Sequence, residues 1–353
     1  MNKQPNITWE KGSAYDLFVS LRVLHNPDKF GLRPSWAAGV RSRLPTQLRD
    51  VLETSQKFLK VPLSFIHSLP APKKDVATAL AVLEALSPED RLSAMFFGGK
   101  NDPKTQHDAE FLSSLAGKQR LTASMAEQIR QTYTNPQQVT KERVRAAFEA
   151  WSDQSSFGDK FVQALKSFTK SFFNEEETRI IPAQSKALNE AQILAAGTDI
   201  LSLLEKLSAG VRMDWITGIS NLILAPSFWG APFVFFDKLD EETGIILFGS
   251  RPKGMTLVPG DLVPEDLLNA LKALADPTRL RILRYLLEGP RSPSELAKIL
   301  RLRPPTVVHH LYNLRLAGLV LVTVSPRAER RYAVRMDGIN STVKHLNAFL
   351  SGD

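Results

Sequence analysis

Basic and hydrogen-bonding side chains gather in one short stretch near the C-terminal end of the chain. From Pro304 to Leu316 the residue types favour a helix, one face of which would carry Thr, Val, His and Tyr side chains. Such side chains can contact base edges in the major groove of duplex DNA, and nearby arginines suit phosphates or the minor groove. The chemistry expected of this stretch is therefore recognition of double-stranded DNA. The residues assigned to it are Arg303, Pro305, Thr306, Val308, His309, Tyr312, Arg315, Arg327, Arg330 and Arg331.

Two short helices and two strands would hold these side chains in place. Ser294–Leu300 and Pro304–Leu316 are predicted to form a helix-turn-helix, with Arg301–Arg303 as its turn. Leu319–Val324 and Arg331–Arg335 alternate as the two strands of a wing, whose tip holds Arg327 and Arg330. The face of the second helix expected to enter the core carries Val307, His310, Leu311 and Leu314.

Two further helices are predicted immediately before this motif. One covers Pro264–Ala275, and the second begins at Pro277, which suits a first helical turn, and ends near Glu288. Gly289 stops this helix, and Gly318 stops the predicted recognition helix. The pattern is that of a winged helix-turn-helix.

This region resembles the ArsR family of winged-helix repressors. The resemblance rests on ALADPTRLRIL (Ala273–Leu283), on SELAKIL and PPTVVHHLYNLRLAGLV within Ser294–Val320, and on the wing ending ERRYAV. It implies a homodimer joined through the first and last helices of the domain, here about 265–275 and 338–350. Two recognition helices would then read a palindromic operator with half-sites about one helical turn apart.

The sequence departs from the family pattern at positions that matter for function. Family members usually carry a serine where Val308 stands and a capping serine where Arg303 stands, so the base contacts must differ. Metal-sensing members hold paired cysteines or an Asp/His set, but this chain has no cysteine, and Asp337 and His345 lack the paired spacing. His309 and His310 point about 100° apart on a helix and rarely share one ion. We expect neither a metal site nor a cofactor.

The positive charge of the chain is concentrated in the same region. The 353 residues carry a formal net charge of +8, and from Glu265 to Asp353 there are 14 Lys and Arg against 8 Asp and Glu. This distribution is expected of an electrostatic DNA footprint, although charge alone also fits a solvated basic surface. The absence of cysteine excludes disulfides and agrees with a reducing cytoplasm. The most apolar window, Leu222–Phe236, is too short and interrupted to span a bilayer, so we expect a cytoplasmic protein without a membrane partner.

The preceding 260 residues are expected to be mainly helical, with a small β-meander or hairpin within about 211–250. The predicted strands are Asn221–Ala225, Phe233–Asp237 and Gly244–Phe248. The fold class is therefore mainly α with small β elements. We predict a regulatory or effector domain over 1–260 and a winged helix-turn-helix DNA-binding and dimerisation domain over 261–353. The clearest predicted helices of the first part are Ala14–Leu24, Pro45–Leu59, Thr122–Tyr133, Thr140–Trp151, Phe157–Phe173 and Gln184–Leu207.

The role of the first 260 residues is open at the level of sequence. Sensing a small-molecule effector is the natural hypothesis, and a cluster of aromatic residues could line a pocket for it, although such clusters more often form a core. Phe97–Lys100 lacks the spacing of a phosphate loop and no catalytic motif occurs, so an enzyme is not expected. We predict an effector-responsive repressor. The rivals are a sequence-neutral chromosome-organising protein and a small-molecule enzyme with an appended DNA-binding domain. The aromatic cluster comprises Trp215, Phe228, Trp229, Phe233, Phe235 and Phe236.

Overall fold

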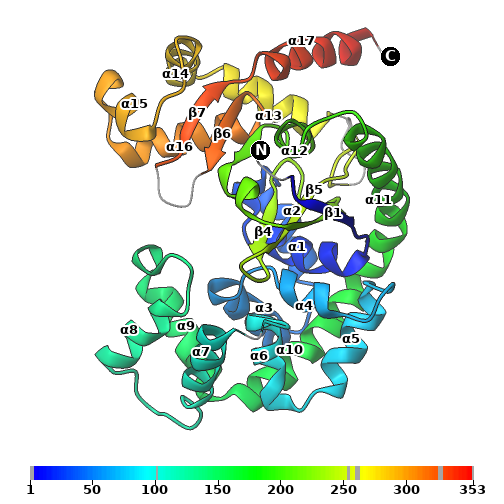
Figure 1. The fold of residues 1–353 in the computed structure, drawn as a ribbon, viewed down its shortest axis with the longest axis vertical. Coiled ribbons are helices and arrows are strands. Elements are labelled where there is room, and N and C mark those ends of the chain that lie inside the picture. Colours follow the sequence, from blue (N-terminus) through cyan, green and yellow to red (C-terminus); the bar gives the residue numbers. More distant parts are fainter. Residues whose placement is uncertain (1–3, 101, 253–254, 259–262, 325–328, 352–353) are drawn as a thin grey trace.

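Helices make up most of the chain, and two small sheets lie among them (Figure 1). The computed structural model describes residues 4–100, 102–252, 255–258, 263–324 and 329–351. The helices of the first half are α1 (Ser13–Leu24), α2 (Pro34–Arg41), α3 (Thr46–Phe58), α4 (Leu63–Ser68), α5 (Val76–Ala85), α6 (Pro88–Phe97), α7 (Pro103–Ser113), α8 (Ala123–Gln131), α9 (Lys141–Ser152) and α10 (Gln154–Phe168). The later helices are α11 (Asn174–Ala195), α12 (Ile200–Leu207), α13 (Glu265–Leu274), α14 (Pro277–Leu287), α15 (Pro293–Leu300), α16 (Pro304–Leu316) and α17 (Met336–Ser351). The mainly helical class is confirmed.

Local capping residues decide where several of these helices begin. The Asp75 side chain accepts a hydrogen bond from the backbone N–H of Thr78 at 2.8 Å, and Thr140 caps α9 in the same way. The predicted helix Gln184–Leu207 is divided in the structure, because Asp199 caps a new helix by accepting from the N–H groups of Leu201 and Ser202. The capping residue therefore starts α12 separately from α11.

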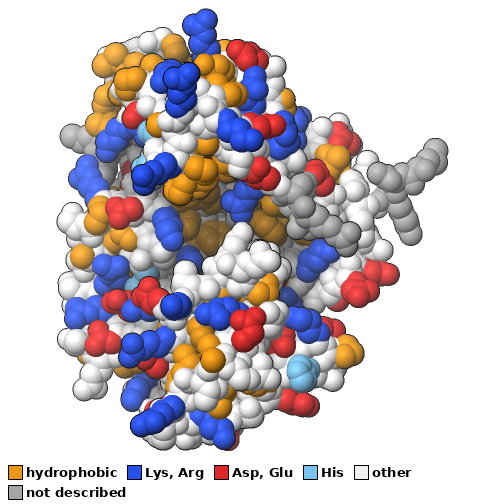
Figure 2. Space-filling view, turned by 90° about the vertical axis from the view of Figure 1, so that its left-hand side faces the viewer, with side chains coloured by type: hydrophobic (Ala, Val, Ile, Leu, Met, Phe, Trp, Pro, Cys, Tyr) orange, Lys and Arg blue, Asp and Glu red, His pale blue; other side chains and the backbone are white. Residues whose placement is uncertain are grey.

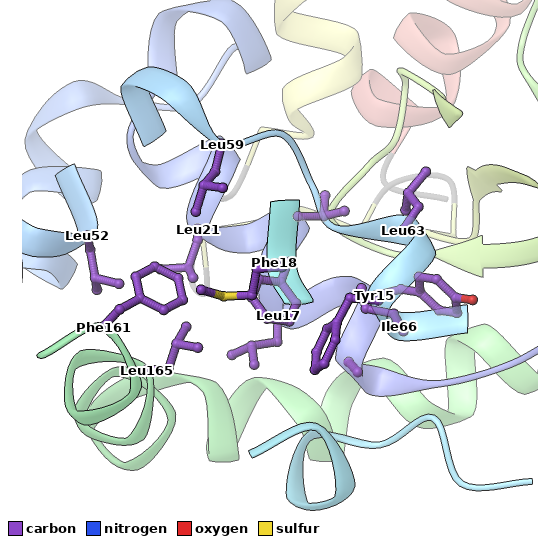
Figure 3. Packing of buried hydrophobic residues seen from close by; sticks show 14 of the residues in the cluster. Tyr15, Leu17, Phe18, Leu21, Leu52, Leu59, Leu63, Ile66, Phe161 and Leu165 are labelled. Atoms are coloured by element: carbon purple, nitrogen blue, oxygen red, sulfur yellow. The ribbon is translucent and has the colours of Figure 1, made fainter. Parts of the chain in front are cut away.

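The largest hydrophobic core is built around α1, which is buried along nearly its whole length. Helices α3, α4 and α10 pack around it, and Figure 3 shows their side chains meeting. The predicted helix Phe157–Phe173 brings Phe161, Phe168 and Phe172 into this core. Its last turn, Thr169–Phe173, is π-helical. The residues labelled in the figure are Tyr15, Leu17, Phe18, Leu21, Leu52, Leu59, Leu63, Ile66, Phe161 and Leu165.

The first sheet has four strands in the order β1-β3-β5-β4. The strands β3 (Asn221–Ser227), β4 (Phe235–Lys238) and β5 (Thr243–Gly249) agree with the predicted positions. β4 and β5 form the expected antiparallel hairpin, but β3 pairs with β5 in parallel, so the strands do not follow one another as a meander. β1 (Asn6–Trp9), which was not predicted, adds a parallel edge beside β3.

The second sheet joins parts of the chain that the predicted domain boundary separates. Its order is β2-β6-β7, in which β6 (Val320–Val324) and β7 (Arg331–Val334) are the antiparallel wing strands. β2 (Val211–Met213), from the first 260 residues, pairs with β6 in parallel. A backbone ladder therefore ties the wing to the preceding part of the chain. In the parts of the chain that the structure describes, no helix has both the length and the apolar character needed to cross a membrane.

A buried carboxylate holds the end of β3 against the helical core. Asp16 of α1 is completely buried and accepts hydrogen bonds from the backbone N–H groups of Phe228 and Trp229, both at 2.9 Å. The Ser227 hydroxyl donates to it at 2.7 Å, and Gln184 Nε2 of α11 donates at 2.8 Å. Burial raises the pKa of Asp16, while these donors act in the opposite direction by favouring the ionised form. The four donors therefore suit a carboxylate.

Asp16→Asn is expected to lower the free energy of unfolding by about 3 kcal/mol, because an amide nitrogen would face buried donors in place of an acceptor oxygen. Urea unfolding of the full chain measures this loss. Asp50→Asn on the exposed side of α3 is the matched control and should shift stability by less than about 0.5 kcal/mol. Equal stabilities of the two variants would contradict the role assigned to Asp16.

Candidate nucleic-acid interface

Local hydrogen bonds fix the two helices that precede α16, the helix that carries most of the predicted DNA-reading residues. The Asp276 side chain caps α14 by accepting from the backbone N–H of Arg279 at 2.8 Å. At the start of α15, Ser292 and Glu295 form a reciprocal capping box, with bonds of 3.2 and 2.6 Å. Arg301 ends α15 in a left-handed conformation with φ of 57°. The caps thus set where α14 and α15 begin, and Arg301 starts the tight turn of the helix-turn-helix.

One face of α16 packs into the domain as predicted. Val307, Leu311 and Leu314 are fully buried. His310 lies beside them with its side chain 15% exposed, and its Nδ1 atom is 3.8 Å from Asp276 Oδ1. Burial lowers the pKa of His310, and the Asp276 carboxylate opposes this shift. His310 is thus a partly buried packing residue, as the spacing indicated.

The N-terminal half of α16 presents the first group of predicted DNA contacts to solvent. Arg303, Pro305, Thr306 and His309 are exposed, and Val308 is 48% exposed despite its apolar side chain. Arg303 occupies the N-cap position, where a guanidinium, which has no acceptor, cannot cap the helix. Together these residues form a continuous exposed surface at one end of the helix.

The C-terminal half of α16 lies against the preceding part of the chain. Tyr312 stacks on Phe233 with ring centroids 5.5 Å apart, and its hydroxyl donates to the backbone oxygen of Lys29. Arg315 is only 5% exposed, and its Nη2 atom donates to the backbone oxygens of Ser208 at 2.8 Å and Pro232 at 3.2 Å. Burial lowers the pKa of Arg315 to about 10. In this arrangement Tyr312 and Arg315 hold α16 and do not share its exposed surface.

The wing supplies a second exposed basic position. Arg330 is exposed just before β7. Arg331 is also exposed but is engaged within the domain, because it contacts the Glu295 carboxylate at 3.4 Å and donates to the backbone oxygen of Pro290 at 2.6 Å. Arg327, predicted at the wing tip, lies outside the described residues. Among the described wing residues, Arg330 is therefore the side chain best placed for a phosphate contact.

Comparison with known proteins gives the family of this region. Residues 276–321 match the family described as "Bacterial regulatory protein, arsR family". These residues form an ArsR-family helix-turn-helix domain. Over 63 residues the chain is 49% identical to the HTH-type transcriptional regulator CmtR of Mycobacterium bovis and of Mycobacterium tuberculosis. That stretch is 18% of this chain and 52% of each relative, so the chain spans about half the length of the curated relatives it matches.

One solved structure also matches a part of the chain. The crystal structure of an ArsR family transcriptional regulator is 31% identical and covers 25% of this chain and 90% of its own, with a TM-score of 0.23. The family match and the matches to CmtR support DNA-binding regulation by the C-terminal part. The large N-terminal part has no assigned role.

The surface around the ArsR-family domain carries scattered positive charge. Figure 2 shows Lys and Arg side chains over the upper part of the molecule and around a hollow between its upper and lower parts. In the described ranges, no group of three or more His, Cys, Asp or Glu side chains is arranged to hold a metal ion.

Two sets of contacts at this domain were not predicted from the sequence. Glu329 accepts hydrogen bonds from the Ser294 hydroxyl at 2.7 Å and from its backbone N–H at 3.2 Å, which ties the wing to α15. The second set joins α16 to Ser208, Pro232 and Phe233. Phe233 was visible as part of an aromatic cluster, but nothing in the sequence pattern indicated that the cluster meets the recognition helix.

Arg315→Met is expected to lower the free energy of unfolding by about 2 kcal/mol, because the backbone oxygens of Ser208 and Pro232 would lose a buried donor. Chemical denaturation of the full chain measures the change. Arg303→Met, at an exposed position on the same helix, serves as control and should change stability by less than about 0.5 kcal/mol. A loss no larger than that of the control would show that the contact of α16 with the N-terminal part is weak.

Proposed function

We propose that this protein is a dimeric, DNA-binding transcriptional repressor that acts in the cytoplasm and reads a palindromic operator. The observation that carries the proposal is the exposed N-terminal half of α16 beside a basic wing, within a domain of the ArsR family. A helix of this kind fits the major groove, where Thr306 and Val308 suit thymine methyl groups and His309 suits a base or phosphate. Arg303 and Arg330 are assigned to the flanking phosphates.

The two helices at the edges of the domain support dimerisation. α17 packs along α13 but leaves several apolar side chains in solvent, and Figure 1 shows it at the outer edge of the molecule. Such exposed apolar area favours burial against a second copy. A two-fold dimer would place two recognition helices on successive turns of DNA. The exposed apolar residues of α17 are Met336 (49%), Val343 (53%), Phe349 (42%) and Leu350 (74%).

We propose that the N-terminal part regulates this DNA binding and is not an enzyme. Its contacts with the recognition helix through Tyr312 and Arg315 support the first statement, since a change in that part would be felt at α16. The proposed trigger is a small-molecule effector. No membrane partner enters the proposal.

The function can be tested by selecting binding sites from random duplexes with the full chain. The selection is run once with and once without metabolites from a cell extract. We expect a palindromic consensus and an affinity whose logarithm falls by about 0.9 per phosphate contact for each unit of log salt. Binding without sequence preference would identify a chromosome-organising protein, and a site without two-fold symmetry would contradict the dimer. If the chain consumed a metabolite during incubation with the extract, that result would instead favour an enzyme.

Arg330→Ala is expected to weaken binding to all duplexes alike and to reduce the salt slope by about 1, because one phosphate contact is lost. Titration at several salt concentrations, with the selected site and a scrambled site, measures both effects. Arg120→Ala changes an arginine exposed in the loop before α8 and is the control for net charge. A fall in affinity confined to the selected site would assign Arg330 to base reading.

Thr306→Ala is expected to relax preference at one base pair of each half-site, at a cost of about 1–3 kcal/mol for the preferred base. Repeating the selection with the variant identifies the position. His309→Ala gives an independent second position, while Thr278→Ala, on α14, should leave the consensus unchanged. If the Thr306 variant selects the original consensus with full stringency, the orientation proposed for α16 is wrong.

A further inference from the structure

A cavity of about 730 Å³ lies where the N-terminal part meets the ArsR-family domain. Its walls come from the α12–β2 connection, the β3–β4 connection, the residues after β5, α13, the end of α16 and the start of α17. The volume lies within the range of small-molecule sites in proteins. No single segment closes it, so an occupant would touch both parts of the molecule.

The cavity combines an apolar lining with charged groups, and several of its acids are paired with basic side chains. Phe30, Phe233 and Leu316 contribute apolar wall. Among its acids, the Glu205 carboxylate pairs with Arg212, and that of Asp337 pairs with Arg335 at 2.9 Å. The carboxylate of Asp266 lies 3.7 Å from His345 Nδ1. Glu265, the fourth lining acid, also has an interaction of its own. These acids therefore do not call for a cationic ligand.

Arg251 is a lining residue whose guanidinium is only partly hydrogen-bonded, although Glu265 and Asp266 of the same lining act favourably on its charge. Its Nη2 atom donates to the backbone oxygen of Ala231 at 2.9 Å, but its Nη1 atom is buried and has no hydrogen-bond partner among the described residues. The adjacent Ser250 hydroxyl is likewise buried without a partner there. Burial lowers the pKa of Arg251, and the nearby Glu265 and Asp266 carboxylates oppose this shift. A buried donor without an acceptor costs free energy that an incoming anion would recover.

The same walls hold the recognition helix. Ser208 and Pro232, whose backbone oxygens accept from Arg315, both line the cavity. Phe233, on which Tyr312 stacks, lines it as well. Gly31 follows the lining residue Phe30 and has φ of +70°. A Cβ atom on residue 31 would lie 2.5 Å from Asn269 Nδ2 of α13, so the backbone packs closely at this wall. An occupant that shifts these walls would therefore act directly on α16.

We propose that this cavity is the effector site and that it binds a small organic anion, with an apolar body and a carboxylate or phosphate head held by Arg251. A guanidinium matches both head groups because it can donate two parallel hydrogen bonds. The apolar body would lie against the aromatic and aliphatic wall. The claim that the anion regulates DNA binding rests on the proposed function, whereas the claim that the cavity binds the anion does not.

Ligand-observed NMR and calorimetry on the full chain test the binding. The probes are phenylacetate, octanoate and phenyl phosphate, and phenylacetamide, octanamide and phenol are their neutral counterparts. At least one anion should bind saturably, with its neutral counterpart weaker by about tenfold or more, because a charge-assisted pair is lost. Comparable binding of the two, or no binding by any anion, would overturn the proposal.

Variants locate the site. Arg251→Met should weaken the bound anion by about tenfold or more, and Arg251→Lys should retain part of the affinity because it keeps the charge without the planar fork. Arg120→Met, remote in sequence and exposed, is the control. Since Arg251→Met alone could unfold the chain, Leu316→Trp, which fills the cavity from α16, is the second variant and should also prevent binding. Unchanged affinity in folded Arg251 variants would place the anion elsewhere.

A final measurement separates this inference from the proposed function. The affinity for the selected duplex should change severalfold at saturating anion in the natural chain, but not in Arg251→Met. Sequence-specific DNA binding without any response to the anion would leave the repressor proposal intact and overturn the effector site. Anion binding by a chain that selects no DNA sequence would do the reverse.

Discussion

The carboxylate of Asp16 is the point on which the arrangement of the two parts depends. It fixes the residues that leave β3 by accepting from Ser227, Phe228 and Trp229. A few residues later the same segment carries Pro232 and Phe233, which contact the recognition helix. One buried interaction near the N-terminus therefore sets, through a short and well-anchored segment, the surface against which α16 lies.

Buried charges at this junction are stabilised by neutral dipoles more than by counter-ions. Asp16 is surrounded by hydrogen-bond donors, and Arg315 donates to two backbone oxygens. Desolvation disfavours the charged form of each group, which raises the pKa of Asp16 and lowers that of Arg315. Because such groups are costly to leave unsatisfied, they favour one arrangement of the surrounding backbone over alternatives. This cost is the reason why the junction between the two parts favours a single backbone arrangement.

The parts of the fold that could be predicted are those set by neighbours in sequence. The helix-turn-helix was visible because proline, capping and apolar spacing act within a few residues, and Val307, Leu311 and Leu314 are buried as that spacing requires. The strand order was not, since parallel pairing of β1 with β3 joins residues more than 200 positions apart. The division between α11 and α12 was also missed, because the apolar pattern runs on without a break past Asp199, the residue that caps α12.

In the candidate site, too, the features of α16 set by neighbouring residues could be predicted, and those set by distant residues could not. An amphipathic pattern assigns one face to the core and the opposite face to solvent, so Tyr312 and Arg315 were expected on DNA together with Thr306 and His309. The structure instead gives α16 a second buried surface, supplied by the N-terminal part, at its C-terminal half alone. The exposed half is free to meet DNA while the other half contacts the N-terminal part. A ligand can change how α16 lies against the N-terminal part only by binding one arrangement of this junction more tightly than another. A cavity walled by both parts can bind in this way, because its shape depends on the arrangement.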